Sequence, residues 1–190
     1  MFHSPFEAVC DWYPQPLESL HGHTPPEKLL PWLLHPGSLT AALKHLSNGE
    51  FSVQILHQGW QQPRLEERRA LNLRERSRAL IREVLLYGNG QPWVYARSVL
   101  PERTLAGKSR YLRSLDNRPL GELLFSQPDT RRGPIVLNRL QRNPQCQLPE
   151  LQGMGSDAWS RRSTFWLHDK PLLVAESFLS SFNPHTPPMT

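Results

Sequence analysis

The chain has 190 residues, of which 38% are hydrophobic and 21% charged, with a net charge of +5 and only two cysteines. This length corresponds to one domain, and no apolar run approaches the roughly 20 residues of a membrane-spanning helix. Two cysteines exclude a disulfide scaffold or a Cys-rich zinc module, and the first residues lack the basic and apolar regions of a signal peptide. We therefore expect a cytoplasmic protein that does not insert into a membrane.

The excess of positive charge comes mainly from arginine, which binds phosphates and small carboxylates through the same planar fork. The arginines occur in short pairs, Arg68-Arg69, Arg131-Arg132 and Arg161-Arg162, and form no long basic run. A basic surface of this kind suits a nucleic acid, and it equally attracts a small dianionic metabolite. Charge alone leaves both classes of partner open.

Residues 1–26 contain several prolines and little periodicity, which predicts an irregular N-terminal lead-in. The following patterns predict two short helices, a strand and a solvated helix. In chain order these are Glu27–Leu34 with a bend at Pro31, Leu39–Leu46 behind Ser38 as its N-cap, Phe51–Gln58, and Arg64–Leu73.

The clearest local pattern is a β-hairpin. Two alternating apolar runs, Leu80–Tyr87 and Pro92–Leu100, flank the short segment Gly88-Asn89-Gly90. An Asn-Gly pair between such runs is typical of a tight antiparallel hairpin.

The second half of the chain predicts a helix, a strand and another hairpin. Pro119 is placed at the first helical position of Leu120–Phe125. The remaining elements are a strand at Ile135–Leu140, a long loop or insertion at Arg142–Asp157, a hairpin formed by Ser163–Leu167 and Leu172–Leu179, and a frayed tail at 183–190. Strands joined by turns, with a few short helices, predict a single α+β domain over residues 27–182, built on an antiparallel β-sheet flanked by short helices.

Two charged residues fall on the apolar faces of predicted strands. Arg82 alternates with Leu80 and Val84, and Glu176 alternates with Leu172 and Val174. A buried charge needs a partner, so these residues either pair with each other or with a neighbour such as Glu83 or Arg78, or the faces are exposed. A third reading is a cavity for a small molecule with a carboxylate at one end and a hydroxyl at the other.

Three further positions are weaker candidates for binding. Arg97 shares a predicted face with Trp93 and Tyr95, although a stacked or solvated arginine explains this pattern equally well. Leu39 and Leu120 begin the two predicted helices, where backbone amides lack intrahelical partners and favour an anion. Most such amides are satisfied by a cap or by water.

Other catalytic chemistry has no counterpart in the sequence. The motifs of P-loop, dinucleotide-binding and HExxH metal enzymes are missing. His21-Gly22-His23 is the only short histidine pair that suggests a metal, and two histidines in a proline-rich segment rarely suffice. We expect neither a metal nor an organic cofactor.

Four segments together resemble the chorismate pyruvate-lyase family. They are WLL and GSLT within Trp32–Thr40, LIREVLLYGNGQPWVYARSVLP at Leu80–Pro101, RPLGELLF at Arg118–Phe125, and WSRRSTFWLHDKPLLVAESFL at Trp159–Leu179. Their order and spacing extend the resemblance over residues 27–182. The hairpin with I-R-E-V-L-L, followed by the strand with K-P-L-L-V-A-E, is its most specific part.

The resemblance implies a cytoplasmic, usually monomeric enzyme that converts chorismate to 4-hydroxybenzoate and pyruvate, supplying the ring precursor of ubiquinone without a cofactor. It implies an α+β fold with an antiparallel sheet and a product site enclosed beneath helical flaps. The family's ligand positions correspond to Leu39, Arg82, Leu120 and Glu176, two of which the strand pattern had already singled out. The first is commonly Met in the family and is Leu39 here, an exchange that should be tolerated if the backbone amide does the binding.

On this reading Arg82 binds a carboxylate, helped by the two helix amides, and Glu176 binds the ring hydroxyl. Arg97 is a candidate for the second carboxylate of chorismate or for holding Glu176. One alternative is a binding domain of the sensor type, which would bind 4-hydroxybenzoate without turning over chorismate. A nucleic-acid binder is the other alternative, and it leaves Arg82 and Glu176 unexplained.

Overall fold

A computed structural model describes residues 2–8, 12–14 and 24–189, and within them the chain forms an antiparallel sheet of nine strands. The strands are β1 (Phe6–Glu7), β2 (Tyr13–Pro14), β3 (Phe51–Gln61), β4 (Ala79–Gly88), β5 (Gln91–Pro101), β6 (Arg131–Arg132), β7 (Val136–Arg142), β8 (Asp157–Leu167) and β9 (Lys170–Phe178). Their spatial order is β1-β7-β8-β9-β5-β4-β3, with β2 also paired to β7 and β6 to β8. The predicted α+β class with an antiparallel sheet is confirmed.

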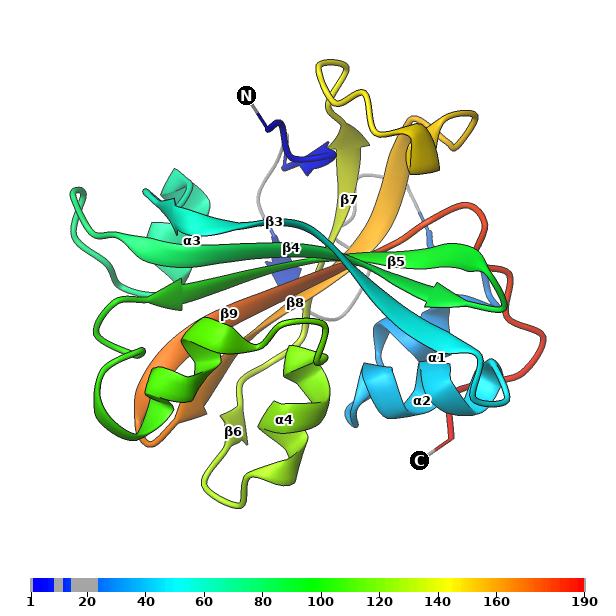
Figure 1. The fold of residues 1–190 in the computed structure, drawn as a ribbon. Coiled ribbons are helices and arrows are strands. Elements are labelled where there is room, and N and C mark those ends of the chain that lie inside the picture. The colour runs from blue at the N-terminus through cyan, green and yellow to red at the C-terminus, as the bar shows by residue number, and fades with distance from the viewer. Residues whose placement is uncertain (1, 9–11, 15–23, 190) are drawn as a thin grey trace.

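Short helices cover both faces of this sheet. They are α1 (Leu30–Leu33), α2 (Leu39–Leu46), α3 (Leu65–Ala70) and α4 (Leu120–Ser126), with 3-10 turns η2 (Gly107–Ser114) and η3 (Pro149–Leu151). Figure 1 shows α1, α2 and α4 gathered on one side of the strands, with α3 against the other. Within the described residues, none of the helices is long and apolar enough to span a bilayer.

Both predicted hairpins are confirmed. Asn89 and Gly90 connect β4 to β5 with φ of 51° and 72°, the left-handed conformation that a type I′ hairpin turn requires at both positions. The β8–β9 turn uses His168 and Asp169 in the same region, with φ of 49° and 60°. Gly88 is also required sterically, because a Cβ there would lie 2.1 Å from the ring of Trp93.

Several helix boundaries differ from the prediction. The helix expected over Glu27–Leu34 is reduced to α1, because proline is accepted only in a first turn and Pro31 therefore sets the start at Leu30. Pro119 is the N-cap of α4 and not its first helical residue. By contrast, Ser38 caps α2 as predicted, and its hydroxyl accepts a hydrogen bond from the Ala41 amide at 3.3 Å.

The terminal segments are more ordered than their prolines indicate. Part of the lead-in lies outside the described residues, but β1 and β2 both pair with β7, and Phe6 is buried. At the other end the Trp32 indole donates to the carbonyl oxygen of Thr186 at 3.1 Å, so the segment after Asn183 is not frayed there. The loop between β7 and β8 contains η3, and its Leu151 packs beside Tyr95.

The two faces of the sheet bury separate apolar clusters. On the face beneath α1, α2 and α4, one cluster gathers around Trp32, Leu39 and Val84, and a second around Leu120 and Val174. On the opposite face, α3 and the N-terminal segment cover two other clusters. The polar residues that interrupt each face lie between its two clusters, and those between the first two form the candidate site.

Candidate active site

Arg82 lies in the middle of β4 and is buried at 2% exposure. Its guanidinium donates to Gln58 Oε1 at 2.6 Å and to the carbonyl oxygens of Asp116 at 2.6 Å and Arg118 at 3.2 Å. Among the described residues it forms no ion pair with a carboxylate, and burial lowers its pKa. Since arginine has five N–H donors, two remain for a ligand, which would also supply the missing negative charge.

Glu176 lies on β9, on the same face of the sheet, and its partner is Arg161. The Arg161 Nε donates to Glu176 Oε2 at 2.6 Å, and this arginine is 1% exposed. Its Nη1 also donates to the carbonyl oxygens of Trp32 at 2.9 Å and His35 at 2.8 Å. The structure therefore excludes a direct Arg82–Glu176 pair and shows that both residues are shielded by protein.

Arg82 and Glu176 are separated by one strand, β5, which presents only small side chains between them. Arg82 pairs with Ser98, and Glu176 pairs with Ala96. Two strand spacings of about 4.8 Å, with an offset of two residues along the strand, place the two Cα atoms roughly 12 Å apart. The space above these small side chains, between the guanidinium of Arg82 and the carboxylate of Glu176, is the candidate site for a small ligand.

The first residues of α2 and α4 lie over this face. Leu39 belongs to the same apolar cluster as Val84 and Ala96, and Leu120 to the same cluster as Val174, so both side chains lie in the apolar layers on either side of the candidate site. The two helix starts are close: a Cβ on Gly121 would lie 3.1 Å from Thr40 Oγ1. The structure therefore brings Leu39, Arg82, Leu120 and Glu176 together. Their roles in binding remain predictions.

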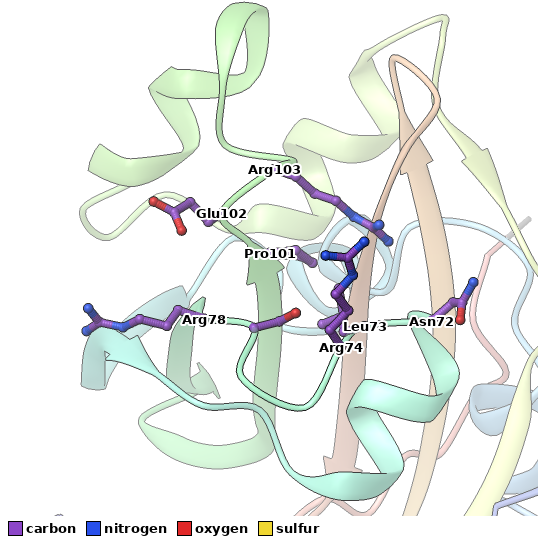
Figure 2. Close-up of a pocket in the computed structure, with 8 residues that line it drawn as sticks. Asn72, Leu73, Arg74, Arg78, Pro101, Glu102 and Arg103 are labelled. Atoms are coloured by element: carbon purple, nitrogen blue, oxygen red, sulfur yellow. The ribbon is translucent and has the colours of Figure 1, made fainter.

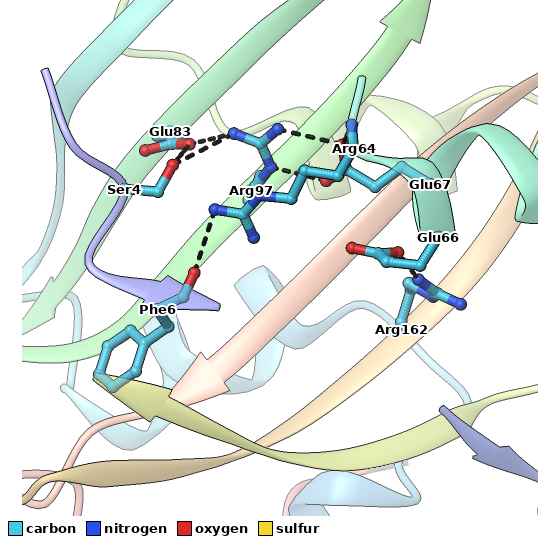
Figure 3. A network of polar contacts seen from close by, with 8 residues as sticks. All are labelled: Ser4, Phe6, Arg64, Glu66, Glu67, Glu83, Arg97 and Arg162. Atoms are coloured by element: carbon cyan, nitrogen blue, oxygen red, sulfur yellow. Dashed lines mark hydrogen bonds and ion pairs between the residues drawn. The ribbon is translucent and has the colours of Figure 1, made fainter. Parts of the chain in front are cut away.

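Arg97 does not belong to this group, which corrects the sequence-based expectation. Its side chain lies on the opposite face of the sheet, where its Nε donates to Glu67 Oε1 at 2.6 Å and its Nη1 pairs with Glu83 (Figure 3). The reason is a β-bulge: Tyr87 pairs with Pro92, but Leu86 pairs with Val94, so Trp93 is an extra residue in β5. If the pairing continued without a bulge, with Trp93 opposite Leu86, Arg97 would pair with Arg82 and share its face.

The network around Arg97 is buried and tightly coupled. Burial alone would lower the pKa of Arg97, but the contacting Glu67 carboxylate raises it above the usual arginine value. Likewise burial would raise the pKa of Glu67, and contact with Arg97 lowers it. Arg162 pairs with Glu66 at the edge of the same network (Figure 3). The arginines and glutamates of this network therefore neutralise one another, and their burial is explained by these ion pairs.

Two residues of the candidate site were missed by sequence reasoning. Arg161 was noted only as half of a basic pair, although it alternates with Ser163 and Phe165 on the inner face of β8. Arg132, on the two-residue strand β6, carries no periodic pattern, yet its Nε donates to Ser163 Oγ at 3.1 Å. Only the pairing of β6 with β8 brings it to the site.

A basic hollow lies elsewhere, where β4 begins and β5 ends. It has a volume of about 360 Å³ and is lined by Asn72, Leu73, Arg74, Ser77, Arg78, Pro101, Glu102 and Arg103. Figure 2 shows Arg74 and Arg103 on one side of it, with Arg78 and Glu102 on the other. A neighbouring hollow of about 480 Å³ shares Asn72 and Leu73 with it. Neither is lined by any of the predicted site residues.

The predicted absence of a metal is not tested by the geometry. In the part of the chain that the structure describes, no three His, Cys, Asp or Glu side chains gather as a metal site. The His21-Gly22-His23 segment lies outside the described residues.

Comparison with solved structures identifies the fold. The ligand-binding domain of a GntR-family transcriptional regulator from Bordetella bronchiseptica superposes with a TM-score of 0.54 at 21% identity, covering 75% of this chain and 92% of that one. The C-terminal domain of the histidine utilization repressor from Pseudomonas syringae pv. tomato gives 0.52 at 16% identity, covering 74% and 99%. At these identities the likeness concerns the fold alone.

Sequence comparison identifies the family. The family model described as chorismate lyase matches residues 15–184. A protein of Marinobacter nauticus named "Probable chorismate pyruvate-lyase" is 41% identical over 148 residues, covering 78% of this chain and 74% of that protein. A protein of the same name from Pseudomonas syringae pv. tomato is 40% identical over 177 residues, covering 93% and 91%. The chain therefore belongs to the chorismate lyase family.

Proposed function

We propose that this protein is a chorismate pyruvate-lyase, which eliminates pyruvate from chorismate to give 4-hydroxybenzoate, the ring precursor of ubiquinone. The observation that carries the proposal is the placement of Arg82 and Glu176 on one buried face, with only Ala96 and Ser98 between them. Membership of the chorismate lyase family supports it independently.

Arg82 binds the ring carboxylate through its two remaining donors, and the first amides of α2 and α4, at Leu39 and Leu120, assist it. Glu176 accepts a hydrogen bond from the ring hydroxyl. Because Arg161 already donates to one carboxylate oxygen of Glu176, the side chain is held in one orientation toward the substrate. Leu39 and Leu120 also exclude water from the ring.

The reaction is an elimination that balances without an added reagent. The ether bond to the ring breaks, and its electron pair leaves with the enolpyruvyl oxygen. The ring carbon that bears the hydroxyl loses its hydrogen as a proton, and the C–H electron pair completes the aromatic ring. The released enolpyruvate takes up a proton at its methylene carbon and becomes pyruvate. Since aromatisation provides the driving force, positioning in a dry site is the main contribution of the protein, and Glu176 is the group best placed to assist the proton transfer.

The direct test is to incubate metal-stripped protein with chorismate and to follow both products by chromatography. Equimolar 4-hydroxybenzoate and pyruvate, formed above the spontaneous rate, are expected. If there is no turnover but 4-hydroxybenzoate raises the melting temperature, the protein is a binding domain of the sensor type. If neither signal appears, the proposal is wrong.

Within this proposal the partners are the substrate chorismate and the product 4-hydroxybenzoate. The protein acts in the cytoplasm as a monomer without metal or organic cofactor, and it has no nucleic-acid partner. Size-exclusion chromatography with light scattering tests the monomer, and the metal-stripped assay tests the independence from metal.

A further inference from the structure

Chorismate has a second carboxylate that the roles given above leave unbound. It belongs to the enolpyruvyl side chain, which is attached to the ring carbon next to the hydroxyl-bearing carbon. If Arg82 binds the ring carboxylate and Glu176 the hydroxyl, the side chain must lie at the Glu176 end of the site. The sequence-based candidate for this second carboxylate, Arg97, lies on the other face of the sheet.

Arg132 is the arginine that the fold places at the Glu176 end. Its Nη1 donates to the carbonyl oxygen of His35 at 3.2 Å, the same oxygen that accepts from Arg161 at 2.8 Å. Since Arg161 is in contact with Glu176, the shared acceptor brings the Arg132 guanidinium close to the carboxylate. Burial, followed by the repulsion from Arg161, lowers the pKa of Arg132 to about 10, and Glu176 partly offsets this.

Arg132 also has free hydrogen-bonding capacity. Its Nε is used by Ser163, and its Nη1 by the carbonyl oxygens of His35 and Pro36. Its Nη2 has no hydrogen-bond partner among the described residues, and none of their carboxylates forms an ion pair with it. The guanidinium lies over the ring of Phe165, 5.3 Å from the centroid, a contact that stabilises its position.

Two arginines and one glutamate therefore leave one uncompensated positive charge at this end of the site. We propose that Arg132 binds the carboxylate of the enolpyruvyl side chain of chorismate, through its Nη2, and so recognises the substrate but not the aromatic product. This inference rests on the proposed function. It makes Arg132 a residue that distinguishes chorismate from 4-hydroxybenzoate. The enolpyruvyl side chain, which leaves as pyruvate, is then bound by a residue of β6.

The test compares Arg132→Gln with Arg131→Gln. Arg131 is its neighbour on β6, but its side chain is 66% exposed, forms an ion pair with the exposed Asp169 and lies 5.9 Å from the ring centroid of Trp166. Loss of a charge-assisted hydrogen bond predicts that kcat/KM for chorismate falls by about 10- to 100-fold in Arg132→Gln. The dissociation constant of 4-hydroxybenzoate, measured by calorimetry, should stay within about threefold of the wild-type value, because the product lacks this carboxylate. Arg131→Gln should change neither quantity, and Arg132→Lys should recover part of the loss.

The outcomes separate the inference from the function on which it rests. Active wild-type protein with an unchanged kcat/KM in Arg132→Gln overturns the inference alone. A parallel loss of chorismate turnover and 4-hydroxybenzoate affinity also overturns it, because Arg132 would then only support the turn at His35 and Pro36. Wild-type protein that forms no pyruvate overturns the proposed function together with the inference. Thermal melting of each variant shows whether the fold is retained.

Discussion

Arg132 and Arg161 donate hydrogen bonds to one acceptor, the carbonyl oxygen of His35, from two different strands of the sheet. His35 lies in the segment that connects α1 to α2. Because Arg161 also contacts Glu176, the position of the α2 start is mechanically linked to that of the glutamate. Arg82 holds the start of α4 in a similar way, because its guanidinium donates to the carbonyl oxygens of Asp116 and Arg118 just before Pro119.

The substitution Glu176→Gln should retain the fold and lower turnover. The amide oxygen can still accept from Arg161, but the side chain can no longer accept a proton or bind the hydroxyl as a carboxylate. We expect kcat to fall at least about tenfold, measured by the release of 4-hydroxybenzoate. Glu102→Gln, at the exposed basic hollow, is the matched control. Unchanged turnover in Glu176→Gln would remove this residue from the mechanism.

The substitution Arg82→Ala should weaken product binding and turnover together. Both chorismate and 4-hydroxybenzoate carry the ring carboxylate, so the dissociation constant of the product should rise by about 10- to 100-fold. Arg82→Lys keeps the charge but loses the planar fork, and an intermediate affinity is expected. Calorimetry with 4-hydroxybenzoate measures both, and the exposed Arg69→Ala serves as control. Full affinity in Arg82→Ala would contradict the assignment.

The substitution Arg97→Met should affect stability more than binding. It leaves Glu67 and Glu83 as buried carboxylates without their counter-ion, which predicts a loss of about 3–5 kcal/mol in the free energy of unfolding. Denaturant titration measures this loss. The affinity of the folded protein for 4-hydroxybenzoate should be nearly unchanged, whereas a selective loss of affinity would place Arg97 back in the binding machinery.

His35 should make the folded state sensitive to mild acid. Burial lowers its pKa below the ordinary 6.5, and the nearby Arg161 and Arg132 lower it further. The unfolded chain therefore binds a proton more readily than the folded chain, so stability falls as the pH drops below about 6.5 and levels off below the folded pKa. Denaturant titrations from pH 7.5 to pH 5 should show a smaller decline in His35→Gln than in the wild type. Parallel declines in the two proteins would show that His35 does not cause the sensitivity.

Features that depend on residues close together in the sequence are predictable from it, and features that depend on the pairing of distant strands are not. The β4–β5 hairpin, the Ser38 cap and the position of Arg82 on an apolar strand face follow from local rules of turn chemistry, capping and alternation, whereas alternation left open whether that face is buried. Arg132 was not predictable, because its place depends on a two-residue strand with no periodicity of its own. Arg161 was identifiable in principle by alternation along β8, but its partner Glu176 is defined only by the register with β9.

The misplacement of Arg97 has a different origin, the single extra residue at Trp93. Side chains alternate between the faces along each strand, but the bulge changes which face of β5 coincides with a given face of β4. That extra residue places the two arginines of the hairpin on opposite faces of the sheet, Arg82 at the candidate site and Arg97 beside Glu67 and Glu83. If the pairing continued from the turn without a bulge, with Trp93 opposite Leu86, Arg97 would pair with Arg82, and Ser98 would face the carboxylates beneath α3. Deleting Trp93 would remove the bulge but leave Arg97 opposite Glu83. The face on which Arg97 lies therefore depends on where the pairing admits an unpaired residue, and not on the length of the strand alone.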